Sequence, residues 1–101
     1  MDVTAKNFDS MIGNHDTVLV DFYAQWCGPC KLQGNILTAF EDKHPNRFTI
    51  AKLDVDDEPS IAQRYGITTV PTLIVFQNGQ PAKRAEGVQT VERLEMLLGQ
   101  A

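Results

Sequence analysis

The amino-acid sequence predicts an α/β fold with three layers, in which about four helices cover both faces of a central mixed sheet of four to five strands. Strand-like and helix-like segments alternate along the first part of the chain, as in parallel strands joined by crossover helices. An Asn-Gly pair between two later strand-like runs predicts a hairpin that closes the sheet with antiparallel pairing. Residues 1–101 are expected to form a single domain without a linker or an internal repeat.

The first elements are expected to be an edge strand, a helix and a buried strand. Val3 and Thr4 form the short edge strand, and Asn7 caps a helix through about Ile12. Residues 17–24 lack the polar alternation of a half-exposed strand, so both faces of this strand are expected to be covered. The next helix follows the two cysteines and runs to about Lys43. Its expected core face consists of Leu32, Ile36, Ala39 and Phe40.

The second half of the chain is expected to add three strands and two helices. Residues 48–55 form a buried strand, and an acidic loop over residues 54–58 leads into a helix that begins at Pro59 and ends at Gly66. Residues 71–76 and 82–87 are the arms of the hairpin around Asn78-Gly79. Thr90 caps the last helix, whose apolar stripe consists of Val91, Leu94, Leu97 and Leu98.

Composition argues against several kinds of partner. The formal net charge is −4 and no cluster of Lys and Arg is present, which argues against a nucleic-acid surface. No apolar run approaches the roughly 20 residues that a membrane-spanning helix needs. Residues 1–4 carry no basic or apolar signal region, which with the cysteine content favours a reducing, cytoplasmic setting. We expect a monomer that binds neither nucleic acid nor a membrane.

Both cysteines of the chain lie in one stretch, Trp26-Cys27-Gly28-Pro29-Cys30-Lys31. Side chains three residues apart on a helix have Cβ atoms roughly 5–6 Å apart, so a small adjustment lets the two thiols form a disulfide. Gly28 permits the turn, and Pro29 suits the first helical turn, where no amide donor is needed. Cys27 is then expected to face the free N–H groups and the positive dipole end of the helix, which favours the thiolate. The stretch is typical of a redox-active pair.

Other interpretations of these residues are weaker. A structural disulfide between these cysteines would stabilise the fold only slightly, because the loop that it closes is very short. Inert core cysteines would leave Gly28-Pro29 and the preceding Trp26 unexplained. A closed zinc site needs four ligands, and the only histidines, His15 and His44, lie on separate loops without ligand spacing. The acidic residues 54–58 are better explained as a solvated loop before a helix, so no metal is expected.

Asp21 is a carboxyl group amid apolar strand residues. Burying an unpaired carboxylate costs on the order of several kcal/mol, so we expect a raised pKa and a group able to take a proton from Cys30. If the strand is shallow at this point, Asp21 faces water instead. Lys52 occupies the corresponding place in the next strand. It either pairs with Asp21 and tunes its proton affinity or extends to the surface.

A longer set of motifs surrounds the cysteine pair. Residues 20–31 read Val-Asp-Phe-Tyr-Ala-Gln-Trp-Cys-Gly-Pro-Cys-Lys, and Val70-Pro71-Thr72 follows further along the chain. Residues 51–56, 65–67 and 76–79 add matches between and after these two motifs. With these motifs in this order and spacing, nearly the whole chain resembles the thioredoxin family.

The resemblance implies a thioredoxin fold and a thiol–disulfide oxidoreductase, specifically a general protein-disulfide reductase. Cys27 would attack a disulfide of a substrate protein, and Cys30 would resolve the mixed disulfide and leave the Cys27-Cys30 disulfide behind. Because Cys27 precedes the helix and Cys30 lies one turn inside it, we expect Cys27 to be exposed and Cys30 to be shielded. Asp21 is implied as the acceptor of the Cys30 proton, with Lys52 beside it.

The resemblance also implies a substrate-binding surface around Cys27. Thioredoxins have a cis-proline opposite the cysteine pair, and Val70-Pro71 matches that motif. The backbone of Val70 is therefore expected to face the site and to bind a substrate strand by hydrogen bonds. The other residues assigned to this surface are Trp26, Gly28, Pro29 and Gly87. Alternatively, Trp26 packs as an ordinary core residue and Gly87 only provides a bend.

The implied electron source is NADPH, delivered by a flavoprotein thioredoxin reductase, with no cofactor bound to this chain. The implied partners are that reductase and disulfide-containing substrate proteins. One alternative is a protein of the same fold that acts as an oxidant or is linked to glutathione. The other is a binding subunit that does not cycle its thiols.

Three positions depart from the family pattern. Asn35, after Gly34, stands where many thioredoxins have a proline that kinks the helix. Tyr23 stands where tryptophan is common, and Thr69 replaces a frequent glycine before Val70. We expect these changes to affect the helix shape or reductase recognition and to leave catalysis intact.

Overall fold

The sheet at the centre of the computed structural model has the strand order β2-β1-β3-β4. The structure describes residues 2–99; Met1, Gln100 and Ala101, which the predicted domain span includes, lie outside the described residues. β1 pairs in parallel with β2 and antiparallel with β3, and β3 pairs antiparallel with β4, so the sheet is mixed as predicted. In chain order the elements are α1 (Phe8–Gly13), β1 (Thr17–Tyr23), α2 (Gly28–Lys43), β2 (Thr49–Asp54), α3 (Pro59–Arg64), β3 (Thr72–Gln77), β4 (Gln80–Glu86) and α4 (Val91–Leu97).

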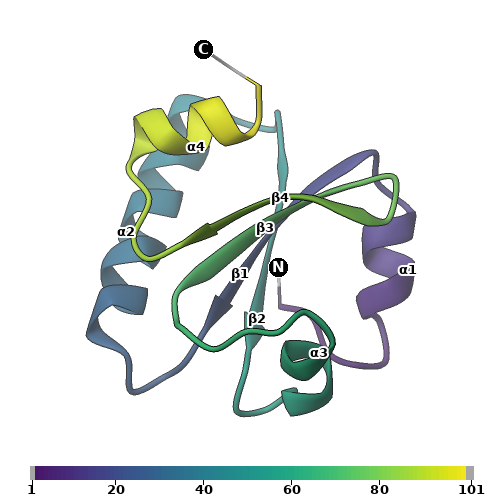
Figure 1. The fold of residues 1–101 in the computed structure, drawn as a ribbon. Helices are drawn as coiled ribbons and strands as arrows, with labels where there is room; N and C mark the ends of the chain where they lie inside the picture. Colours follow the sequence, from purple (N-terminus) through teal and green to yellow (C-terminus); the bar gives the residue numbers. More distant parts are fainter. Residues whose placement is uncertain (1, 100–101) are drawn as a thin grey trace.

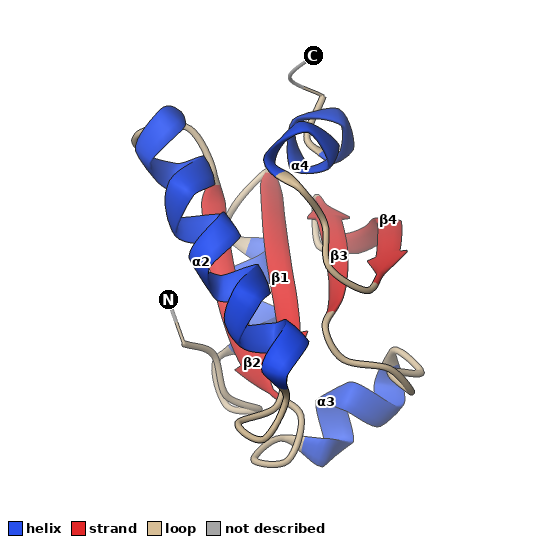
Figure 2. Cartoon of the chain, turned by 90° about the vertical axis from the view of Figure 1, so that its left-hand side faces the viewer, coloured by secondary structure: helices blue, strands red, loops and turns tan. Residues whose placement is uncertain are grey.

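Helices cover both faces of this sheet, with α2 and α4 on one side and α1 and α3 on the other (Figures 1 and 2). Alternate residues of β1 point to opposite faces, as in any strand. Val18, Val20 and Phe22 pack in the cluster that contains α1 and α3 residues. Leu19 packs with Leu37 of α2 and Leu94 of α4. The same alternation places Asp21 on the α2 face of the sheet.

Strand direction brings four loops to one edge of the sheet. The carboxyl ends of the parallel strands β1 and β2 lie at this edge, and so does the start of the antiparallel β3. β4 returns to the same edge, because Glu86 pairs with Thr72 at the start of β3. The cysteine stretch, the acidic loop, Val70-Pro71 and Gly87 therefore converge there.

The hairpin prediction is confirmed. Asn78 and Gly79 both have positive φ, at 52° and 81°, as the tight turn between β3 and β4 requires. Thr90 caps α4 as predicted, since its side chain accepts a hydrogen bond from the Arg93 amide. Among residues 2–99, no helix is long and apolar enough to cross a membrane.

Two predictions about single elements are wrong. The edge strand over Val3 and Thr4 is reduced to one isolated bridge between Asp2 and Lys52, and the chain then turns away at Thr4 toward α1. On α2 the predicted core face is rotated: Leu32 and Ala39 are exposed, whereas Gln33 and Leu37 are buried with Phe40. The spacing of Gln33, Leu37 and Phe40 is equally helical, but a glutamine is an unusual member of an apolar stripe.

Candidate active site

The cysteine pair lies where the chain leaves β1 and enters α2. Cys27 is the N-cap residue of α2, and its Sγ accepts a hydrogen bond of 3.1 Å from the backbone N–H of Cys30. The two residues form a disulfide, with Cα atoms 5.2 Å apart. Pro29 occupies the first turn of the helix, where its missing N–H costs no hydrogen bond. The Cys27 sulfur thus lies at the positive end of the α2 dipole.

The predicted contrast in exposure between the two cysteines is wrong. The exposed fraction is 4% for Cys27 and 5% for Cys30. Both belong to a small cluster with Ala24, and Tyr23 at the end of β1 and Val70 in a neighbouring loop pack against it. What distinguishes the two residues is position: Cys27 caps the helix, and Cys30 is inside its first turn.

Trp26 is exposed, so ordinary core packing does not explain it. Its exposed fraction is 73%, and its indole Nε1 donates a hydrogen bond of 2.8 Å to Oδ2 of Asp56. This bond links the cysteine stretch to the acidic loop. Asp54 orders that loop in turn, because its Oδ1 accepts the amide N–H groups of Asp56 and Asp57. No group of three or more His, Cys, Asp or Glu side chains within residues 2–99 is arranged to hold a metal ion.

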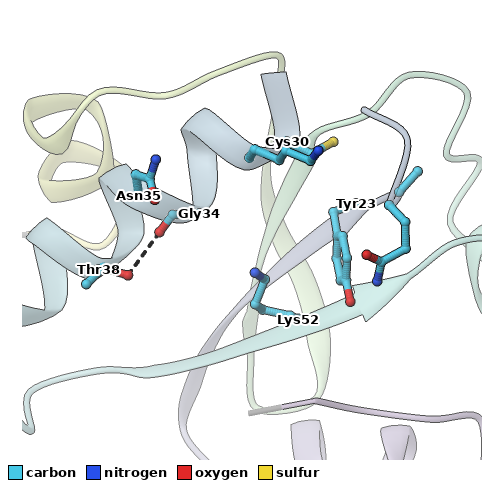
Figure 3. Close-up of a pocket in the computed structure, with 9 residues that line it drawn as sticks. Tyr23, Cys30, Gly34, Asn35, Thr38 and Lys52 are labelled. Carbon is cyan, nitrogen blue, oxygen red and sulfur yellow. Dashed lines mark hydrogen bonds between the residues drawn. The ribbon is translucent and has the colours of Figure 1, made fainter. Parts of the chain in front are cut away.

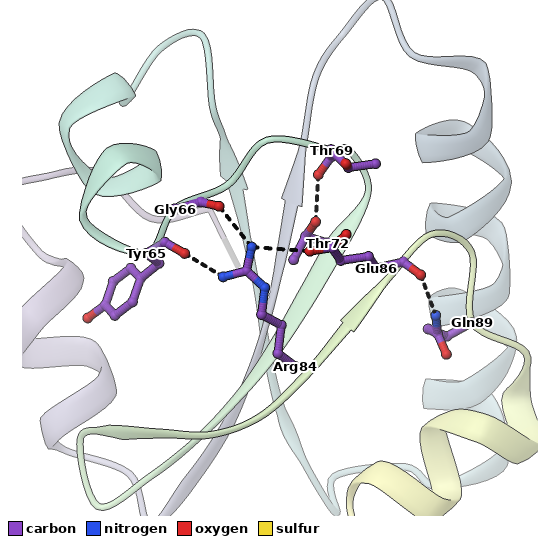
Figure 4. Close-up of polar contacts among 7 residues, drawn as sticks. All are labelled: Tyr65, Gly66, Thr69, Thr72, Arg84, Glu86 and Gln89. Atoms are coloured by element: carbon purple, nitrogen blue, oxygen red, sulfur yellow. Dashed lines mark hydrogen bonds and ion pairs between the residues drawn. The ribbon is translucent and has the colours of Figure 1, made fainter.

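Val70-Pro71 is a cis peptide bond, as predicted. The carbonyl oxygen of Val70 lies 3.7 Å from Sγ of Cys27, so the backbone of this loop faces the cysteine pair. The loop is braced on its inner side by a 2.5 Å hydrogen bond from the Thr72 hydroxyl to the Thr69 carbonyl (Figure 4). At its start, the Arg84 guanidinium donates to the carbonyls of Tyr65 and Gly66.

Gly87 lies next to the cis-proline. Its backbone N–H donates a 2.8 Å hydrogen bond to the carbonyl of Pro71. Its φ of 83° is in the left-handed region, which a residue with a side chain adopts only at a cost. Of the other residues predicted for the substrate surface, Gly28 and Pro29 are exposed, whereas Pro71 is buried, so its prediction as a surface residue is wrong.

Asp21 is fully buried on the α2 face of the sheet. Neither carboxylate oxygen has a hydrogen-bond partner among residues 2–99. Burial raises the pKa of Asp21 from 3.8 to about 6, and the positive charge of Lys52 opposes part of that increase. The expectation of a buried carboxyl group with a raised pKa is confirmed, and the alternative of a water-facing Asp21 is wrong.

Lys52 is the register partner of Asp21 on β2, but it makes no ion pair with that carboxylate within hydrogen-bonding distance. Its Nζ instead lies 4.9 Å from the centre of the Tyr23 ring, a cation–π arrangement. Tyr23 and Lys52 line a cavity of about 370 Å³ that Cys30 also borders (Figure 3). Lys52 therefore acts on Asp21 at longer range and faces the same cavity as Cys30.

The comparisons with known proteins agree with this geometry. A family model described as Thioredoxin matches residues 1–100. The chain belongs to the thioredoxin family. It is 43% identical to a thioredoxin of Alicyclobacillus acidocaldarius subsp. acidocaldarius over 98 residues, which are 97% of this chain and 93% of that protein. It is 43% identical to a thioredoxin of Staphylococcus aureus over 96 residues, 95% of this chain and 91% of that one.

Two further relatives add structure and context. A mutant thioredoxin from Halobacterium salinarum NRC-1 superposes with a TM-score of 0.88 at 31% identity, covering 98% of this chain and 88% of the other, so the fold is the thioredoxin fold. A bifunctional thioredoxin reductase/thioredoxin of Mycobacterium leprae is 42% identical over 85 residues, 84% of this chain and 19% of that protein. Members of this family are thiol–disulfide oxidoreductases, and this chain has a redox role.

Sequence reasoning missed two side chains at the site. The sequence predicts only a solvated loop for Asp56, whereas Asp56 accepts a hydrogen bond from the indole of Trp26. The sequence pattern assigns no role to Gln33, although it is fully buried one turn beyond Cys30. Its spacing from Leu37 and Phe40 was the available signal for a buried position.

Proposed function

We propose that this chain is a general protein-disulfide reductase that cycles Cys27 and Cys30 between dithiol and disulfide. The observation that carries the proposal is the position of the Cys27 sulfur, at the start of α2 and opposite the Val70 carbonyl. The helix end favours the thiolate, and the neighbouring backbone offers hydrogen-bonding groups to an extended substrate.

The reaction begins with the reduced protein. The Cys27 thiolate attacks one sulfur of a substrate disulfide, which forms a Cys27–substrate bond and expels the other substrate sulfur as a thiolate that takes up a proton. Cys30 then loses its proton and attacks the Cys27 sulfur. The mixed disulfide breaks, the second substrate thiolate leaves, and the Cys27-Cys30 disulfide forms. Two electrons pass to the substrate.

Asp21 is the proposed acceptor of the Cys30 proton. A carboxyl group with a pKa of about 6 exchanges protons near neutral pH, where an ordinary aspartate stays ionised. The cavity bordered by Cys30 and Lys52 has the size to hold water, and Lys52 is the proposed regulator of the Asp21 proton affinity.

The proposed substrate surface surrounds the Cys27 sulfur. The exposed indole of Trp26 supplies an apolar contact, and the backbone of Val70 supplies hydrogen-bonding groups that require no particular substrate sequence. Gly28, Pro29 and Gly87 form the rest of this surface, and the buried Pro71 lies beneath it.

We further propose that a flavoprotein thioredoxin reductase returns the disulfide to the dithiol with electrons from NADPH. The support is the relative whose name joins a thioredoxin reductase to a thioredoxin. The chain would act as a single domain and a monomer without a bound cofactor. The proposed compartment is the cytoplasm, whose reducing conditions keep such a pair available as thiols.

Reduction of insulin tests the proposal. The wild-type protein should accelerate precipitation of the insulin B chain with dithiothreitol as the electron source. It should do the same when NADPH and thioredoxin reductase replace dithiothreitol. Cys27→Ser and Cys30→Ser should each show no rate above that of dithiothreitol alone, because either change prevents the cycle. A wild-type protein that is inactive in both assays would favour a non-cycling binding subunit. Turnover with glutathione and not with the reductase would favour the glutathione-linked alternative.

A further inference from the structure

Gln33 is a fully buried amide side chain on α2, one turn beyond Cys30. Its Oε1 accepts a 2.6 Å hydrogen bond from the backbone N–H of Gln89, and its Nε2 donates a 3.1 Å bond to the Gln89 carbonyl. Both backbone groups of Gln89 are thereby bound by one side chain. A buried amide with this geometry is held in a single orientation, since any rotation leaves buried polar groups without partners.

Gln89 itself orders the loop that follows β4. Its Nε2 donates to the carbonyl of Glu86 at 3.2 Å and to the carbonyl of Gly87 at 3.0 Å. The first of these bonds is drawn in Figure 4, where the Gln89 side chain folds back beneath the end of β4. Gln33 of α2 therefore holds the Gln89 backbone, and the Gln89 side chain holds the carbonyls of Glu86 and Gly87 in the same loop.

These bonds continue a closed path around the cysteine pair. Gly87 donates to the Pro71 carbonyl at 2.8 Å, and the adjacent Val70 carbonyl lies 3.7 Å from the Cys27 sulfur. Cys27 in turn caps α2, the helix that carries Gln33. The path therefore joins three segments that are distant in sequence: the helix start, the cis-proline loop and the Gly87 loop.

We propose that Gln33 is a positioning residue that fixes the Gly87 loop and the cis-proline loop relative to Cys27, so that protein substrates meet a preformed backbone surface. The proposal rests on the proposed function, because it assigns these loops to substrate binding. An extended substrate that binds by backbone hydrogen bonds needs donors and acceptors at fixed positions, and ordering them in advance lowers the cost of binding. An apolar side chain would fill the same space and leave the loop free to shift.

The proposal predicts that loss of the Gln33 side chain impairs the reduction of protein substrates but not of small disulfides. Gln33→Leu keeps the side-chain volume but removes both bonds to Gln89. We expect the KM of this variant for insulin to rise by about fivefold or more, because the loops that bind the substrate lose the hydrogen bonds that order them. Hydroxyethyl disulfide makes no extended backbone contacts, so its second-order rate constant with Cys27 should change by less than about twofold.

A matched variant separates positioning from stability. Leu37→Ala opens a cavity under the same helix without touching Gln89, and it should lower the melting temperature at least as much as Gln33→Leu. If Gln33 acts by positioning, Leu37→Ala leaves KM for insulin within about twofold of wild type. If both variants raise KM in proportion to their loss of stability, the role of Gln33 is only structural and the proposal is overturned.

Hydrogen exchange gives a measurement that does not depend on activity. In Gln33→Leu the backbone amides of Gly87 and Gln89 should exchange faster, while amides in the middle of β1 stay protected. Unchanged exchange at Gly87 and Gln89 would contradict the proposal, as would faster exchange with an unchanged KM for insulin. If the wild-type protein reduces neither substrate, the proposed function fails, and the exchange rates alone then decide whether Gln33 orders these loops.

Discussion

Asp21 has the most unfavourable environment of any ionisable group at the site. It is buried in an apolar layer, its oxygens have no hydrogen-bond partner in the described part of the chain, and Lys52 is directed toward the ring of Tyr23. A group in this position reduces stability when it is ionised. Retaining it is consistent with the proposed role, because the same burial that costs stability raises the pKa of Asp21 to about 6.

This environment predicts a pH-dependent effect of Asp21→Asn on stability. In the unfolded chain the pKa of an aspartate is near its ordinary value of 3.8, so the folded protein binds the proton more tightly. Stability therefore falls as pH rises from about 4 to about 6 and stays low above that range. Asparagine cannot ionise, so the variant should gain about 2 kcal/mol more at pH 8 than at pH 4, where the unfolded aspartate is already partly ionised.

Urea unfolding of the oxidised proteins at the two pH values measures this difference. Any fixed cost of burying the amide is present at both values and cancels. An equal effect of the substitution at the two pH values would show that folding does not raise the pKa of Asp21. The same variant should resolve mixed disulfides more slowly near neutral pH, since the proposed proton acceptor is gone.

At the scale of the element, α2 departs from the family pattern at Asn35. It is continuous from Gly28 to Lys43, with Asn35 at the position where many thioredoxins have proline. Gly34 precedes Asn35 and contributes no side chain to the helix. A Cβ atom built on Gly34 would lie 3.6 Å from Nζ of Lys52, which is an ordinary van der Waals contact.

Gly34→Ala should therefore stabilise the protein. Glycine in a helix interior is less favourable than alanine by up to about 1 kcal/mol, and the extra methyl group fits beside Lys52. The expected result is an increase of about 0.5–1 kcal/mol in the free energy of unfolding, measured by urea titration at neutral pH. Gly66→Ala is the control, because its φ of 62° makes the same substitution unfavourable there. A loss of stability in Gly34→Ala would mean that Lys52 cannot accommodate the methyl group.

Element by element, the sequence was most informative where local chemistry decides the structure. Asn78-Gly79 specifies its turn through two positive φ angles, and the absence of polar alternation in β1 specifies a strand covered on both sides. The rotation of α2 was not predictable from hydrophobicity, because Gln33 is buried through a partner on a distant loop. The burial of Cys27 likewise depends on Val70 and Val55, which only the fold brings near.

At the scale of the whole molecule, the topology of the sheet assembles the site. Two strands end and one begins at the edge where Cys27 lies, and the hairpin returns β4 to that edge. The segments that meet at this edge are distant from one another in sequence, so the sheet brings them together. The sequence predicted which residues would meet because the motifs matched a family, and the hydrogen bonds that join them followed only from the structure.

The most direct test of the central claim is to trap the intermediate. Cys30→Ser, reduced and then mixed with oxidised insulin, should form a stable mixed disulfide through Cys27, detected by intact-mass spectrometry and located by peptide mapping. Cys27→Ser should form none under the same conditions. An adduct on Cys30 in the Cys27→Ser protein, with no adduct in the Cys30→Ser protein, would contradict the assignment of Cys27 as the attacking thiolate.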